Sequence, residues 1–182
     1  MENAKKAADM GVDMIVLTGN PGVGVDNRAI TKALADLNEA VGDRVILTAG
    51  KMHASGILSE AGEKILTKED AETFIEAGAD VLLLPAPGTV PGFTMEHAAE
   101  LIKTAHEKGV LAMTTIGTSQ EGADEETIRQ IALMCKMAGA DIHHIGDSGY
   151  MGMALPENIT AYSVAIRGKR HTYRRMAMSL VR

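Results

Sequence analysis

The stretch Gly78-Ala79-Asp80-Val81-Leu82-Leu83-Leu84 joins the end of one predicted helix to an apolar run that is short enough to be a buried strand. The same junction recurs as Gly139-Ala140-Asp141 and, with one change, as Gly11-Val12-Asp13. Glycine at the first position suits the left-handed conformation in which many helices end. Each copy therefore marks a passage from a helix to a strand.

Repetition at about 30 residues extends this pattern along the chain, because Gly42 and Gly109 also close helical stretches and precede apolar runs. A unit of this length is one strand with its crossover helix, and such units build parallel sheets. Ligands of parallel α/β folds bind at the carboxyl ends of the strands. The five predicted strands are Met14–Leu17, Val45–Leu47, Val81–Leu84, Val110–Met113 and Ile142–Ile145.

Helix start signals fill the intervals between the predicted strands. Asp26, Thr67, Thr94 and Asp124 each stand before a segment with apolar residues at helical spacing, as N-cap residues do. Cys135 falls on the apolar stripe of one of these segments and is predicted to lie in the core.

Two architectures accommodate five parallel strands. Residues 2–10 read as a helix with no strand before it, and a closing helix is predicted from Asn158 to Arg182. Together with the near-equal period, these features favour the carboxyl-terminal part of a (β/α)8 barrel over an open, flavodoxin-like doubly wound sheet. The chain is then one α/β domain, residues 1–182, that is incomplete at its N-terminus. Its outer strands would have unpaired edges, so we expect a homo-oligomer.

Composition excludes several classes of protein. The chain has 182 residues, a net charge of -6 and 3% aromatic residues, a combination that gives no nucleic-acid footprint. A single cysteine cannot form an intrachain disulfide, and no apolar run approaches the roughly 20 residues that cross a bilayer. The first residues lack the apolar region of a signal peptide. We therefore expect a cytoplasmic protein without nucleic-acid or membrane partners.

Candidate catalytic residues lie in or directly after two of the predicted strands. Lys51 lies at the second strand end, where it could neutralise an anion or form a Schiff base with a carbonyl group, and His53 could act as a general acid or base. His143 and His144 interrupt the fifth strand, and only one of them can face the site because adjacent residues point to opposite faces. His143 with Asp147 is the predicted proton-transfer pair.

Small and hydroxyl-bearing residues at three strand ends are the predicted ligand contacts. Glycines after the first strand can present backbone N–H groups to a phosphate or carboxylate, and threonine and serine after the fourth can donate hydrogen bonds. The cofactor is undetermined; a divalent metal is compatible with the sequence, although no metal ligand is assigned. The candidate ligand-binding residues are Gly19, Asn20, Gly22, Gly24, Thr115, Thr118, Ser119, Ser148 and Gly149.

Three segments carry a resemblance to a known family: residues 16–22, residues 49–56 and residues 167–175. They look like a poorly characterised bacterial TIM-barrel family, labelled either phosphoenolpyruvate phosphonomutase-like or haloacid dehalogenase-like hydrolase. The resemblance implies a barrel of which this chain is the carboxyl-terminal portion. No Asp-x-Asp nucleophile motif follows any strand, and the acidic magnesium ligands and catalytic cysteine loop of the phosphonomutases are not visible.

The site residues favour an enzyme that acts on a small phosphorylated or carboxylated metabolite by lyase or isomerase chemistry. Two alternatives stay open, a non-catalytic ligand-binding or regulatory module and an inactive truncated fragment. A hydrolase is compatible with the resemblance but has no visible motif. In the last segment, Arg167, Arg170 and Arg174 are predicted to share one helix face as an anion site, a partner surface or a solvated face.

Overall fold

The computed structural model describes residues 1–117, 120–146 and 154–178. Five parallel strands form one sheet in which spatial order follows chain order. The strands are β1 (Met14–Thr18), β2 (Ile46–Gly50), β3 (Val81–Pro85), β4 (Leu111–Thr115) and β5 (Ile142–His144). A flavodoxin-like sheet would insert β1 between β2 and β3. The sheet is therefore a half-barrel, which confirms the preferred architecture, and the open-sheet alternative is wrong.

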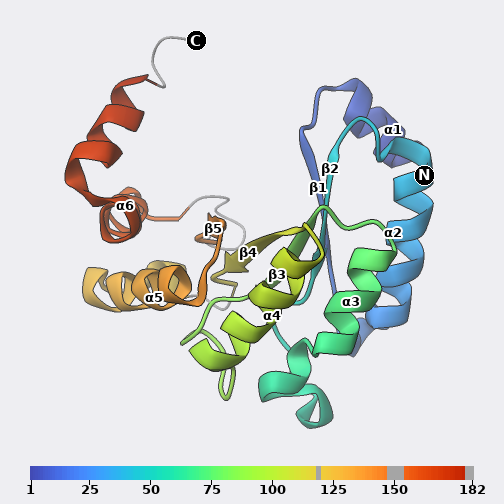
Figure 1. Cartoon of the computed structure of the whole chain (residues 1–182), viewed down its shortest axis with the longest axis horizontal. Coiled ribbons are helices and arrows are strands. Elements are labelled where there is room, and N and C mark those ends of the chain that lie inside the picture. Colours follow the sequence, from blue (N-terminus) through green and yellow to red (C-terminus); the bar gives the residue numbers. More distant parts are fainter. Residues whose placement is uncertain (118–119, 147–153, 179–182) are drawn as a thin grey trace.

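The helices lie in an arc around one side of this sheet, from α1 near the N-terminus to α6 beyond β5 (Figure 1). They are α1 (Glu2–Asp9), α2 (Asn27–Val41), α3 (Lys68–Glu76), α4 (Met95–Glu107), α5 (Glu125–Ala138) and α6 (Pro156–Met178). Short 3-10 turns occupy Pro21–Val23, Leu58–Glu60, Gly62–Ile65 and Gln120–Gly122. None of the helices in the described part of the chain combines the length and apolar character needed to cross a bilayer.

The predicted helix caps are confirmed. The side chains of Asp26, Thr67, Thr94 and Asp124 each accept a hydrogen bond from a backbone N–H in the first turn. Gly139 ends α5 in the left-handed conformation, with φ of +99°. Gly42 departs from the pattern, since α2 ends there with φ of -62°.

The aspartates of the Gly-Ala-Asp junctions have a structural role. Asp80 Oδ2 accepts a hydrogen bond of 2.8 Å from the N–H of Leu47, on the neighbouring strand β2. Asp141 Oδ2 does the same for Ala112 on β4, at 2.9 Å. Each carboxylate extends the hydrogen-bonded ladder at the point where two strands begin. The repeated motif therefore fixes the register of adjacent units.

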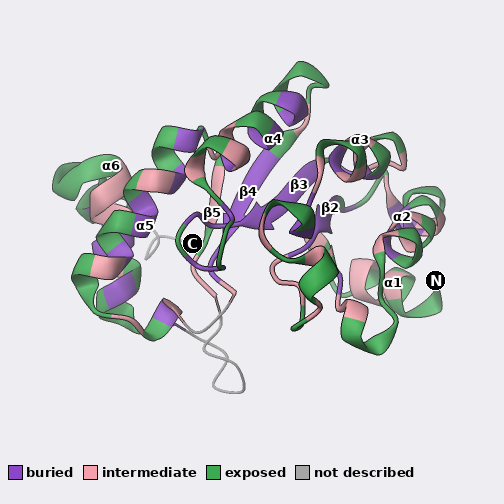
Figure 2. Cartoon of the chain, turned by 90° about the horizontal axis from the view of Figure 1, so that it is seen from below, coloured by how far each residue is buried: buried purple, intermediate pink, exposed green. Residues whose placement is uncertain are grey.

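The two faces of the sheet differ in burial. Alternate residues such as Leu47, Leu82 and Ala112 join the core beneath the helices. The opposite, inner face carries Val81, Leu83 and Met113, which form a small cluster of their own. Figure 2 shows burial concentrated in the middle strands β2, β3 and β4 and in the helix sides turned toward the sheet. The inner face is open at its margins, where three residues are about half exposed: Val16 46%, Ile46 43% and Leu111 49%.

α6 is interrupted at Gly168, whose φ of 78° and ψ of 160° are not helical. Arg167 precedes this break and Arg170 and Arg174 follow it. The prediction that these three arginines share one helix face is therefore wrong, because the helix does not continue through Gly168. The prediction for Cys135 is confirmed: its side chain is fully buried on α5.

Candidate active site

His144 lies on the inner face of the sheet at its carboxyl edge. The β4–β5 register pairs it with Thr115. Its Nδ1 lies 2.9 Å from Thr115 Oγ1 and accepts a hydrogen bond of 3.1 Å from the N–H of Gly146. Because Nδ1 accepts from a backbone N–H, the proton of the neutral ring belongs on Nε2. His144 is exposed, so this Nε2–H group is available to a bound molecule.

Neighbouring residues hold this imidazole in place. Gly146 has φ of 89°, and a Cβ there would lie 2.5 Å from the carbonyl oxygen of Ile116, so only glycine lets this N–H approach the ring. Met52, which follows β2, places its Sδ 3.5 Å from Thr115 Oγ1. We call Met52, Thr115, His144 and Gly146 the inner-face cluster. It joins the ends of β2, β4 and β5.

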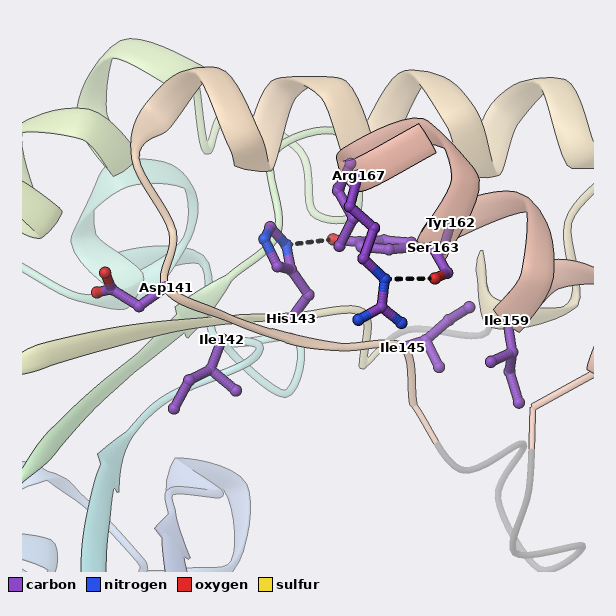
Figure 3. A pocket seen from close by; sticks show the side chains of 9 residues that line it. Asp141, Ile142, His143, Ile145, Ile159, Tyr162, Ser163 and Arg167 are labelled. Atoms are coloured by element: carbon purple, nitrogen blue, oxygen red, sulfur yellow. Dashed lines mark hydrogen bonds between the residues drawn. The ribbon is translucent and has the colours of Figure 1, made fainter. Parts of the chain in front are cut away.

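His143 points the other way, toward α6. Figure 3 shows its ring directed at Tyr162, and its Nδ1 lies 3.0 Å from the Tyr162 hydroxyl. The two residues line a cavity of about 360 Å³ between β5 and α6. Arg167 lines the same cavity. The structure therefore places His143 on the helix side, apart from the inner-face cluster. The strand period of two separates the adjacent histidines.

Burial lowers the pKa of His143; Asp141 partly opposes this effect and Lys136 adds to it. The unfolded chain takes up this proton near pH 6.5, whereas the folded chain takes it up only at lower pH. Stability from this group is thus fully present above about pH 7 and is lost as pH falls through 6.5 toward the folded pKa.

We expect the urea midpoint to fall between pH 7 and pH 5, and to fall less in His143→Gln than in the parent, because glutamine does not titrate. His171→Gln is the matched control, since His171 is exposed. An equal fall of the urea midpoint between pH 7 and pH 5 in the parent and in His143→Gln would contradict this prediction.

Lys51 is buried at the carboxyl end of β2. Its side chain is 2% exposed, and its Nζ lies 2.8 Å from Glu60 Oε2, on a side chain that is 33% exposed. The stem passes so close to Gly19 that a Cβ there would lie 3.0 Å from Lys51 Cγ and 2.9 Å from Ile30 Cδ1. Lys51 thus lies beside the glycine loop, as predicted, but its charge is already balanced by a carboxylate.

His53 is hydrogen-bonded to Ser55 and not to the Lys51–Glu60 pair or to the inner-face cluster. Its Nδ1 lies 3.0 Å from Ser55 Oγ. The turn at Gly22 lies beside this pair, since a Cβ on Gly22 would be 3.5 Å from the Ser55 Cβ. The predicted residues Lys51 and His53 therefore share a loop but have separate partners.

The loop from Gly19 to Gly24 forms a closed turn. The N–H groups of Val23 and Val25 both donate to the Asn20 carbonyl, and that of Gly24 donates to Pro21. These groups are used within the loop and are not available to an anion. Anion binding by Gly19, Asn20, Gly22 and Gly24 stays a prediction.

Five predicted residues lie outside the described part of the chain: Asp147, Thr118, Ser119, Ser148 and Gly149. Within residues 1–117, 120–146 and 154–178, no group of three or more histidine, cysteine, aspartate or glutamate side chains could hold a metal ion. Thr115, by contrast, lies within the inner-face cluster.

Sequence reasoning did not single out Met52 or Glu60, and it left the choice between the two histidines open. Ile142 and Ile145 flank the two histidines, so the alternation of apolar and polar residues along β5 does not tell which histidine faces the inner side of the sheet. Glu60 lies nine residues after its partner in an irregular loop, where spacing predicts no contact. Only Met52 had a usable signal, its position at a predicted strand end.

One curated relative covers part of the chain. The "Putative N-acetylmannosamine-6-phosphate 2-epimerase" of Haemophilus influenzae is 34% identical over 89 residues, which are 49% of this chain and 33% of the relative. The chain thus matches about a third of the length of that protein.

Solved structures with the same fold are longer than this chain. A deoxyribose phosphate aldolase from Aeropyrum pernix superposes with a TM-score of 0.64 at 20% identity, over 91% of this chain and 64% of that chain. An archaeal fructose 1,6-bisphosphate aldolase superposes with a TM-score of 0.64 at 18% identity, over 89% of this chain and 61% of that chain. These likenesses establish the barrel kind of fold. The barrel implied by the resemblance is supported, whereas none of these proteins is a phosphonomutase or a dehalogenase.

One family model matches the chain over its full length, residues 1–182, and is described as "Domain of unknown function (DUF7916)".

Proposed function

We propose that this chain, which belongs to the DUF7916 family, acts on a small phosphorylated metabolite by lyase or isomerase chemistry at the carboxyl edge of its half-barrel. The observation that carries the proposal is the orientation of His144. Its Nδ1 is held by Gly146 and Thr115, which leaves an exposed imidazole with its proton on Nε2. A fixed donor at this edge is what enolate chemistry requires.

In this chemistry the His144 Nε2–H donates a hydrogen bond to the carbonyl oxygen of the substrate. The bond strengthens as negative charge grows on that oxygen, either when a neighbouring C–H proton is removed or when a C–C bond breaks. A neutral imidazole is a suitable donor for this purpose. Asp147, which follows β5 in the sequence, is the proposed proton acceptor.

Lys51 has a positioning role in the proposal. Its ammonium group is paired with Glu60 and its side chain is 2% exposed. A substrate carbonyl would have to displace Glu60 to form a Schiff base. We therefore assign Lys51 to holding the loop between β2 and α3 beside Gly19, and leave the proton-transfer role to the inner face.

The substrate class is supported by the named relatives. The Haemophilus influenzae relative is named for N-acetylmannosamine-6-phosphate, and the Aeropyrum pernix enzyme for deoxyribose phosphate. Both names describe phosphorylated sugars whose open-chain forms carry a carbonyl group. A sugar phosphate is thus the first compound to test, with carboxylated metabolites as the second class.

The proposal predicts exchange of a carbon-bound proton with solvent. In D2O, the chain should exchange the proton next to the carbonyl of N-acetylmannosamine 6-phosphate or of 2-deoxyribose 5-phosphate, as followed by 1H NMR. His144→Gln should slow this exchange about 100-fold, the usual effect of losing one oriented donor to a developing oxyanion. Unphosphorylated N-acetylmannosamine tests whether the phosphate is needed.

His143→Gln is the matched control, because it changes the adjacent residue on the opposite face. It should leave the exchange rate unchanged at temperatures where the variant is folded. Loss of exchange in His143→Gln, with normal exchange in His144→Gln, would exclude the inner-face assignment. Exchange with neither compound would favour a ligand-binding module.

We also propose that the chain forms a homo-oligomer. β1 and β5 are the outer strands of the sheet, and the inner face exposes Val16, Ile46 and Leu111. The Aeropyrum pernix enzyme is itself described as tetrameric. Sedimentation velocity at micromolar concentration should show a dimer or larger species. A monomer at that concentration would contradict the prediction.

A further inference from the structure

A cavity lined by two loops at the carboxyl edge lies apart from the inner-face cluster. It has a volume of about 450 Å³ and lies between the loop from β2 to α3 and the loop from β3 to α4. No lysine, arginine, aspartate or glutamate is among the residues that line it. Its walls are mainly apolar, formed by Ile57, Leu58, Ile65 and Val90. A cavity of this kind accepts an uncharged, apolar group and not a phosphate.

Ser55 at the border of this cavity has an unusual backbone. Its φ is 51°, and no other non-glycine residue in the described ranges has a positive φ. A side chain in this region is strained, and such strain is concentrated at functional sites. Gly56 follows with φ of 80°. The two residues make a sharp turn that presents the serine hydroxyl at the surface.

The groups around Ser55 have the arrangement of an activated nucleophile. His53 Nδ1 lies 3.0 Å from Ser55 Oγ, within reach for proton transfer. The N–H of Gly56 finds no acceptor among the described residues. In hydrolases the N–H of the residue after the nucleophile stabilises the oxyanion. Base, nucleophile and oxyanion donor thus fall within four residues of one loop, His53 to Gly56.

We propose that Ser55 and His53 form an acyl-transfer site whose apolar cavity takes the acyl chain of an uncharged ester. Ser55 Oγ forms a bond to the carbonyl carbon while its proton passes to His53 Nδ1. The alcohol leaves as the C–O bond of the ester breaks, and it takes the proton from His53. Water then attacks the acyl-serine, so the balance is ester plus water giving acid plus alcohol.

The experiment uses a fluorophosphonate reagent, which bonds to an activated serine as fluoride leaves, together with p-nitrophenyl butyrate as substrate. Mass spectrometry of the parent should place the label on Ser55. Ser55→Ala should abolish labelling and ester hydrolysis. His53→Gln should slow both at least about 100-fold, the effect of losing a general base. Ser59→Ala, in the same loop, should behave as the parent.

Ser55→Gly separates loss of the hydroxyl from loss of folding. Glycine adopts a positive φ without strain, so this variant should melt above Ser55→Ala and should still not be labelled. The proposal is overturned if the parent shows no label on Ser55, or if labelling persists at the parental rate in His53→Gln.

Discussion

Replacing Gly50 with alanine is expected to destabilise the protein by more than about 3 kcal/mol, or to prevent it from folding. Gly50 is the last residue of β2, and a Cβ there would overlap the carbonyl oxygen of Leu83 and lie 2.6 Å from its carbonyl carbon. Leu83 belongs to the adjacent strand β3. Because the obstacle is backbone in the middle of the sheet, no side-chain rotation can relieve the overlap.

Gly109→Ala is the control for this prediction. Gly109 has φ of +75°, but a Cβ there would meet nothing within 4 Å. Its replacement introduces backbone strain without a clash and should cost only about 1 kcal/mol. Urea unfolding of both variants measures the difference. Equal midpoints for Gly50→Ala and the parent would show that β2 and β3 separate easily, contrary to the close approach in the structure.

Lys51→Ala is expected to destabilise the protein by about 3 kcal/mol, which lowers the melting temperature by about 6–12 °C for a chain of this size. The sequence predicts that Lys51 neutralises an anion or binds a carbonyl group at a strand end, a role in which its side chain would be open to a ligand. The side chain is instead 2% exposed. Alanine would leave a cavity beside Gly19 and would remove the partner of Glu60.

Lys51→Met separates the stability lost through packing from the stability lost with the ion pair to Glu60. Methionine retains most of the apolar stem, and Glu60 can turn to water because its side chain is 33% exposed. The methionine variant should therefore be clearly more stable than the alanine variant. Thermal unfolding by circular dichroism measures the order. An unchanged melting temperature for Lys51→Ala would contradict the packing described here.

The boundaries of the repeated units were determined by the sequence, because their signals are local. Asp26, Thr67 and Asp124 cap helices through hydrogen bonds to residues three positions away. Gly139 ends a helix because its own backbone takes a positive φ. Each of these interactions spans less than two helical turns. The repeat of about 30 residues in the sequence was therefore enough to locate the strands and to place a site at the carboxyl edge of the sheet.

The tertiary structure alone decided which side chains meet at that edge. Nothing local distinguishes His143 from His144, and the contact of His143 with Tyr162 of α6 assigns the first to the helix side. His144 meets Thr115 only because β4 and β5 pair in one register. Lys51 is buried because the loop to α3 returns Glu60 to it, a contact without a spacing rule. Contacts between separate segments depend on how the strands stack and how the loops fold back, and neither is encoded in the periodicity of a single segment.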